Sequence, residues 1–147
     1  MAAVRRGAWV GLKYVTTLFF LGVIVQFFLV GVGLFGMKDG ATIDNASSLD
    51  AHRGFGFILA DGGALLMLVL VLLAWPTPRK LLGAWILLAV LAFVQPILAD
   101  FHHQWVGMFH PVNAITLLGL SGRLAHYAWT TGKSNGAAEA PAAVPTG

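Results

Sequence analysis

Four long apolar segments, joined by polar connections, dominate the sequence. The first of them, residues 14–36, is apolar over 23 residues apart from two threonines and a glutamine. At about 1.5 Å per residue, a helix of this length crosses the roughly 30 Å hydrocarbon core of a bilayer. Only 10% of all residues are charged, against about 25% in a soluble domain. The sequence therefore predicts an integral-membrane protein surrounded by membrane lipid.

The four segments predict an all-α, up-and-down four-helix bundle that forms one domain, residues 1–130. A polar loop and a basic, proline-rich turn separate the runs, as expected between helices. The expected transmembrane helices are residues 14–36, 51–75, 81–100 and 105–130. The tail, residues 131–147, is rich in Ala, Pro, Gly and Ser, and we expect it to be disordered.

Basic residues are unevenly divided between the two ends of this predicted bundle. Seven of the nine lysines and arginines fall at the end that holds both termini. The positive-inside rule then places both termini in the cytoplasm and the loops after the first and third helices outside. This orientation also explains the net charge of +3, so we expect no nucleic-acid partner. The absence of cysteine excludes disulfides and cofactors held by thiolates.

Four of the five histidines fall at the predicted outer end, namely His52, His102, His103 and His110. His52 and His110 open the second and fourth helices, which are diagonal in such a bundle and run in the same direction. Facing imidazoles in this position could hold a haem iron from both sides. Gly56 and Gly63 share the predicted helix face below His52 and would leave room for a flat macrocycle.

Other interpretations of the outer histidines stay open. Pro111 disfavours helical backbone at His110 and could turn that side chain away, which would leave His102 or His103 as the ligand. Alternatively, His102 and His103 with Asp100 could bind zinc or copper, because imidazole and carboxylate suit these ions. The histidines could also be interfacial residues at helix ends, without any ligand.

Several polar residues near these histidines could support a cofactor. Arg53 directly follows the first histidine and could pair with a haem propionate or simply extend to the interface. Asn113 shares the predicted face of the second histidine. Gln26 and Gln95 could hydrogen-bond around a cofactor or between helices. These two glutamines lie in similar segments, VQFFL and VQPIL, so the two helical hairpins could be copies of one unit.

Asp61 is an acid well inside the second apolar segment, followed by two glycines. Acids within membranes are costly and usually face a bundle interior or a cavity. The helical step of about 100° places Asp61 opposite His52 on a straight helix. It could contact a second subunit, a proton route or the hydroxyl of Thr16 or Thr17, or it could be protonated and hydrogen-bonded.

The segments VQFFLVGVGLFG, AHRGFGFILA, VLAFVQPILAD and MFHPVNAITLLGL resemble an uncharacterised bacterial family of small four-helix membrane proteins, a domain of unknown function. The likeness covers about residues 18–127, and its most specific part is the segment HPVN. It implies a bacterial inner membrane but no activity. More loosely, the histidines opening the second and fourth helices resemble those of membrane b-type cytochromes and of one half of haem A synthase. That resemblance implies that His52 and His110 are the candidates for the axial ligands of haem b.

We therefore expect a membrane protein that binds haem b and transfers electrons near the outer face, with a quinone or a small oxidant as partner. An iron ligated by two histidines favours electron transfer, whereas an open coordination position would favour a membrane oxidoreductase. The alternatives are a non-redox protein that binds zinc or copper, an accessory subunit that contacts a partner through Asp61, or a small transporter. A transporter of this size would need a homo-oligomer to build a path.

Overall fold

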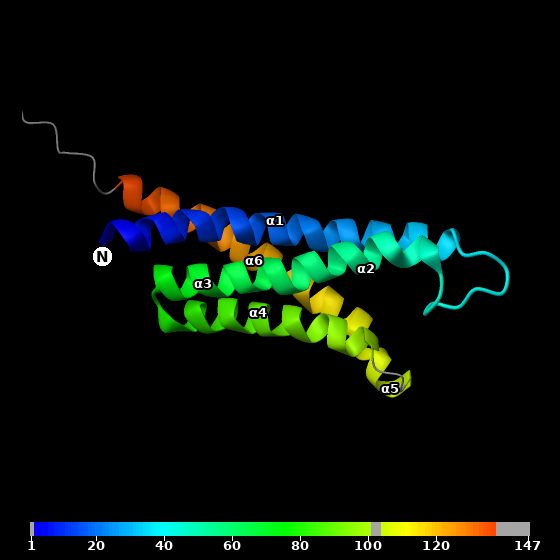
Figure 1. Cartoon of the computed structure of the whole chain (residues 1–147). Helices are drawn as coiled ribbons and strands as arrows, with labels where there is room; N and C mark the ends of the chain where they lie inside the picture. The colour runs from blue at the N-terminus through cyan, green and yellow to red at the C-terminus, as the bar shows by residue number, and fades with distance from the viewer. Residues whose placement is uncertain (1, 101–103, 138–147) are drawn as a thin grey trace, which may run out of the picture.

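The computed structural model describes residues 2–100 and 104–137, and in this part of the chain all regular structure is helical (Figure 1). The described chain forms four long helical arms. The second arm, from Ser47 to Ala74, is continuous but changes from α-helix to π-helix and back. The elements are α1 (Ala2–Phe35), η1 (Ser47–Leu49), α2 (Asp50–Phe57), the π-helical η2 (Ile58–Gly63), α3 (Ala64–Ala74), α4 (Arg79–Asp100), α5 (Gln104–Gly107) and α6 (Phe109–Ala137). The predicted all-α class is confirmed.

The four arms form an up-and-down bundle. α1 packs against α3 and α6, and α4 packs against the same two helices, so α1 lies diagonal to α4 and α3 lies diagonal to α6. The N-terminus and the end of α6 lie at the same end of the bundle (Figure 1). Three arms, α1, the second arm from Ser47 to Ala74, and α4, are long and apolar enough to cross a membrane. The side of a membrane on which the termini lie stays a prediction.

Several helix ends differ from the predicted ones. α1 begins at Ala2 instead of residue 14. Its first turns are joined to the end of α3, because the Arg5 guanidinium donates hydrogen bonds to the carbonyls of Ala74 (3.4 Å) and Trp75 (2.9 Å). Carbonyls at the end of a helix have no acceptor role within their own helix, so they are available to accept the Arg5 hydrogen bonds. α6 continues to Ala137, past the predicted end at residue 130. The rest of the predicted tail lies outside the described residues.

Trp85 of α4 is the centre of the core. Its side chain is fully buried, and its indole Nε1 donates a hydrogen bond to the hydroxyl of Thr16 on α1 at 3.0 Å. Its ring meets the rings of Trp9 (5.7 Å between centroids) and Tyr127 (6.4 Å) edge to face. One buried polar pair therefore joins two diagonal helices within a mostly apolar core. The surrounding core residues include Leu12, Phe19, Met67, Val71, Leu88, Leu117 and Leu124.

Neither threonine of α1 contacts Asp61, so that option is wrong. Thr16 accepts the hydrogen bond of Trp85, and Thr17 accepts one from the indole of Trp129 at 2.9 Å. Asp61 lies in η2 with its side chain exposed. The acid therefore faces away from the interior of its own bundle.

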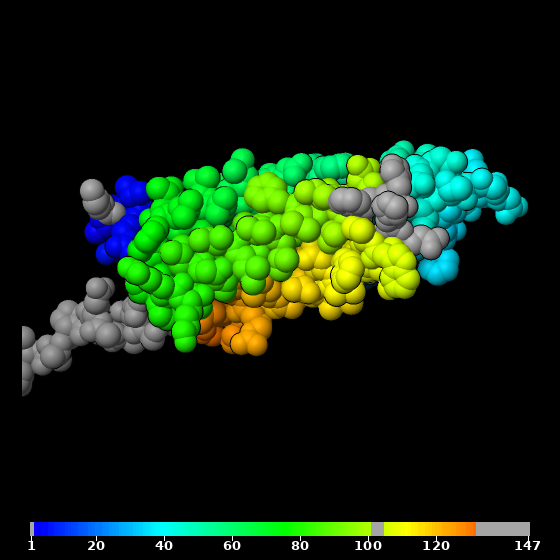
Figure 2. Space-filling view, turned by 90° about the horizontal axis from the view of Figure 1, so that it is seen from below, coloured from blue at the N-terminus to red at the C-terminus, as the bar shows by residue number. Residues whose placement is uncertain are grey.

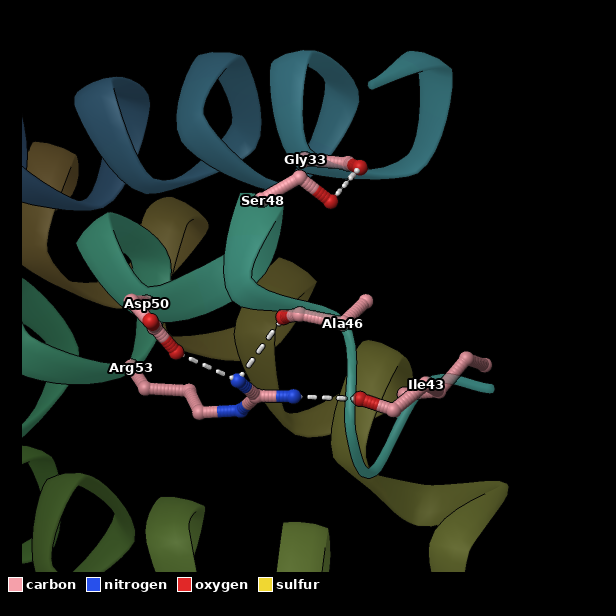
Figure 3. A network of polar contacts seen from close by, with 6 residues as sticks. All are labelled: Gly33, Ile43, Ala46, Ser48, Asp50 and Arg53. Carbon is pink, nitrogen blue, oxygen red and sulfur yellow. Dashed lines mark hydrogen bonds and ion pairs between the residues drawn. The ribbon is translucent and has the colours of Figure 1, made fainter. Parts of the chain in front are cut away.

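Arg53 fastens the loop between α1 and α2 (Figure 3). Its Nη1 donates hydrogen bonds to the carbonyl of Ala46 (3.0 Å) and to the carboxylate of Asp50 (2.8 Å), and its Nη2 donates to the carbonyl of Ile43. The same loop is tied to α1 by Ser48, whose hydroxyl donates to the carbonyl of Gly33 at 2.7 Å. The loop is therefore hydrogen-bonded both to α1 and to α2, although it has little regular structure.

Replacing Thr16 by valine keeps the side-chain volume but leaves the indole N–H of Trp85 without an acceptor in the core. We expect this variant to lower the free energy of unfolding by about 1–2 kcal/mol. Thr116→Val is the matched control, because the Thr116 hydroxyl is exposed and bonds only to its own helix. Unfolding in detergent measures both variants, and equal losses would contradict the special role of the Thr16–Trp85 pair.

Replacing Arg53 by alanine removes the hydrogen bonds to the loop carbonyls. The pair with Asp50 is largely exposed and contributes little, so the loss is about 1 kcal/mol and should be confined to the loop. We expect cleavage by a protease within residues 37–46 to become roughly fivefold faster, while the bundle unfolds as before. Lys38→Ala is the control, since it removes an exposed cation from the same loop. An effect as large in the control would refute the role of Arg53.

Candidate functional site

His52 on α2 and His110 on α6 lie side by side at one end of the bundle. Their ring centroids are 6.4 Å apart and the ring planes are inclined by 79°. Both side chains are half-buried. The predicted meeting of these two histidines across the diagonal is confirmed, whereas their role as ligands stays a prediction.

Pro111 does not turn His110 away from its partner. α6 begins at Phe109, so His110 and Pro111 both lie in its first turn and have helical backbone. Proline is tolerated there, because the N–H groups of a first turn have no acceptor within the helix. The expectation that Pro111 disrupts the helix at His110 is therefore wrong.

The ring of His110 is oriented by the backbone of α4. Its Nδ1 lies 3.0 Å from the carbonyl oxygen of Gln95, and a carbonyl can only accept a hydrogen bond. Nδ1 therefore donates its N–H in this contact. The Gln95 side-chain nitrogen lies 3.4 Å from the other ring nitrogen, Nε2. Histidines that bind metals are commonly held by a carbonyl in this way, because the bond sets both tautomer and ring direction.

Asn113, one turn after His110, holds Gln95 in place. Its buried side-chain amide donates to Gln95 Oε1 at 2.6 Å and to the carbonyl of Leu91 at 2.8 Å. The residue after Gln95 in α4 is Pro96, which lacks an N–H and so weakens the helix locally. Asn113 thus stabilises the part of α4 that positions His110.

The same hydrogen bond occurs in both hairpins. Gln26 Nε2 on α1 donates to the backbone carbonyl of His52 at 3.1 Å. Gln95 Nε2 on α4 donates to the backbone carbonyl of His110, also at 3.1 Å. Each glutamine thereby joins its helix to the first turns of the next arm. This equivalence supports the hypothesis that the two hairpins are copies of one unit.

Two buried polar atoms beside this bond have no hydrogen-bond partner within the described residues, His52 Nδ1 and Gln26 Oε1. Leaving such a group unsatisfied typically costs about 1–3 kcal/mol. Their counterparts in the second hairpin, His110 Nδ1 and Gln95 Oε1, are both satisfied. The site around His52 therefore keeps hydrogen-bonding capacity that the fold does not use.

The glycines below His52 do not form a slot, so this expectation is wrong. A Cβ added to Gly56 would lie 2.7 Å from Gln26 Nε2, and one added to Gly63 would lie 3.3 Å from the ring of Phe19. Both glycines instead allow side chains of α1 to approach the second arm closely. Gly54 lies about 200° around the helix from His52 and is exposed, so an added Cβ there would meet no atom within 4 Å.

The other predicted site residues lie elsewhere. The described contacts of the Arg53 guanidinium are with the loop and Asp50, and Asp100 is exposed at the end of α4. His102 and His103 lie outside the described residues, so the predicted zinc or copper cluster is not tested. Among residues 2–100 and 104–137, no three or more His, Asp or Glu side chains are grouped to hold a metal ion.

Two features of the site were missed in the sequence. The backbone carbonyl of Gln95 orients His110, which no side-chain pattern can reveal. The π-helical turn η2 changes the rotation of the second arm just after His52. The run Asp61-Gly62-Gly63 within it is a signal for such an irregular turn, because glycine is a poor α-helix former.

Comparison with models of known protein families, with curated proteins and with solved structures found no match to this chain.

Proposed function

We propose that this chain is a membrane protein that binds haem b, with His52 and His110 ligating the iron from opposite sides. The observation that carries the proposal is the separation of 6.4 Å between the two ring centroids. Metal–imidazole bonds are about 2.0–2.1 Å long, so two rings directed at one ion have centroids roughly 6 Å apart. The ring separation is therefore compatible with one metal centre between the two histidines.

The available donors suit haem better than a free metal ion. A structural zinc ion usually takes four protein ligands, but the described residues offer only two histidines here. Two imidazoles suffice for haem, because the macrocycle occupies the remaining positions of the iron. The unsatisfied atoms of His52 and Gln26 further support a group bound beside the histidines.

When bound, haem b would supply a one-electron redox couple. His52 and His110 would hold the iron through their imidazoles, and two histidine ligands favour electron transfer over oxygen binding. The Gln95 carbonyl would keep the N–H of His110 at Nδ1 and so set the orientation of the ring. Asn113 would hold Gln95 in place, and Gln26 would support His52 in the corresponding way. A role of Arg53 in holding a propionate stays a prediction, and the loop carbonyls would compete for its guanidinium.

We further propose that the protein lies in the inner membrane of a bacterium, with both termini in the cytoplasm. Three arms long enough to cross a bilayer support the membrane location. The basic residues close to the terminal end, Arg5, Arg6, Lys13, Arg79 and Lys80, support this orientation. The histidines then lie near the outer face, where a quinone or a small oxidant could accept the electron.

Protein purified after expression with ample haem should show a Soret band with the spectrum of six-coordinate, low-spin iron. His52→Ala and His110→Ala should each remove that spectrum, since each removes one axial ligand. His126→Ala is the control, because His126 is exposed on α6 far from the pair. Protein without a Soret band refutes the proposal. A band that survives both ligand substitutions unchanged refutes the assignment of the ligands. Bound zinc or copper without haem would favour the metal alternative.

Gln26→Leu and Gln95→Leu should each lower haem affinity by about 10- to 100-fold, as is usual for residues that orient metal ligands. The low-spin spectrum should persist at saturating haem, since both histidines remain. Haem titration measures the affinities, with Thr116→Val as a control on α6. Unchanged affinity in both glutamine variants would exclude a supporting role for these residues.

A further inference from the structure

Asp61 and Arg123 are exposed charged residues on two diagonal arms, and neither is used by the proposed haem site. Asp61 lies in η2 and Arg123 in the middle of α6. Within the described part of the chain, neither side chain has a hydrogen bond or ion pair, and the salt bridge that does form there joins Arg53 and Asp50. Two opposite charges are therefore left on the surface of an apolar bundle.

Both charges lie at nearly the same depth of the bundle. Gly63 contacts the ring of Phe19, and Gly122 contacts the ring of the next residue of α1, Phe20. Since the second arm and α6 run in the same direction, Asp61 lies two residues before this level and Arg123 one residue after it. At 1.5 Å per residue, they differ in depth by about 5 Å, which is within reach of an arginine side chain.

The surroundings of Asp61 are apolar. Its exposed neighbours Ile58 (68%) and Leu65 (55%) lie one turn before and one turn after it on the second arm. Such a face suits lipid, but a charge in contact with lipid is costly and is usually paired. In a membrane, the face of Asp61 would therefore be stabilised by a partner that brings a positive charge to the same depth.

We propose that the partner is a second copy of this chain, docked side by side in the same orientation, with Asp61 of one copy paired to Arg123 of the next. The chain itself supplies both halves of this complementary interface. A two-fold dimer through either face alone would instead oppose like charges. The contact is therefore heterologous, of the kind that builds rings or rows. The inference rests on the proposed membrane insertion but not on haem binding.

The position of the two charges favours a ring. Asp61 is about half a helical turn from Leu59, which packs on α1, and so lies away from α1. Arg123 lies one turn before Tyr127, whose ring contacts Trp85 of α4. Figure 2 looks onto the face on which α4 lies between the second arm and α6. Because both charges are displaced toward this face, successive copies would curve around α4.

Cysteine cross-linking tests this arrangement, since the natural chain has no cysteine. Ile58 lies one turn before Asp61, and Gly119 lies one turn before Arg123 in open space. Two differently tagged chains, Ile58→Cys and Gly119→Cys, are expressed together in one membrane and oxidised. We expect the mixed cross-link to exceed either self cross-link at least fivefold. Leu21→Cys on α1 replaces Gly119→Cys in the control pair and should cross-link no more than background.

The same experiment with Asp61→Asn in both chains should lower the mixed cross-link at least fivefold. The exchange Asp61→Arg with Arg123→Asp should restore it, because the pair is rebuilt with reversed charges. Dominant self cross-links, a mixed cross-link indifferent to Asp61→Asn, or a monomeric mass in lipid discs would each overturn the proposal. The Soret band of the Asp61→Asn variant is recorded alongside, so that loss of association and loss of haem binding are distinguished.

Discussion

Polar groups inside the bundle are removed from water, so most of them must find a partner within the protein, and the structure depends on this constraint. Helices satisfy the backbone, so few polar side chains remain, and most of them join one arm to another. The Thr16–Trp85 pair connects the diagonal arms α1 and α4, and Arg5 of α1 donates hydrogen bonds to carbonyls at the end of α3. The bundle is therefore held by apolar packing with a small number of specific polar ties.

At the end of the bundle that holds His52 and His110, polar groups of neighbouring arms are paired in the same way in both hairpins. In each hairpin, a glutamine amide donates to the backbone carbonyl of the histidine that begins the next arm. This bond fixes the first turns of α2 and α6 and so brings His52 and His110 together across the diagonal. The two hairpins differ in the polar contacts around this bond. Asn113 completes the network around His110, whereas His52 Nδ1 and Gln26 Oε1 have no partners among the described residues.

Two charged residues, Asp61 and Arg123, differ from these polar residues because they do not join one arm to another. Asp61 and Arg123 both face outward, and the exposed residues around Asp61, such as Ile58 and Leu65, would suit lipid. The change to π-helix in η2 occurs at Asp61 and its two following glycines. Interior polar groups thus explain how one chain folds, whereas the two exposed charges form the proposed contact between copies of the chain.

The sequence alone determined the helical class, the four arms and the end at which the histidines gather, because segment length and apolar character depend only on local composition. It also singled out His52, His110 and the two glutamines. Tertiary structure decided the rest. Pro111 is harmless because α6 begins at Phe109, Gly56 and Gly63 receive side chains of α1, and Arg53 binds its own loop. These outcomes depend on where neighbouring arms approach, and a backbone carbonyl such as that of Gln95 acquires its role only when another helix reaches it.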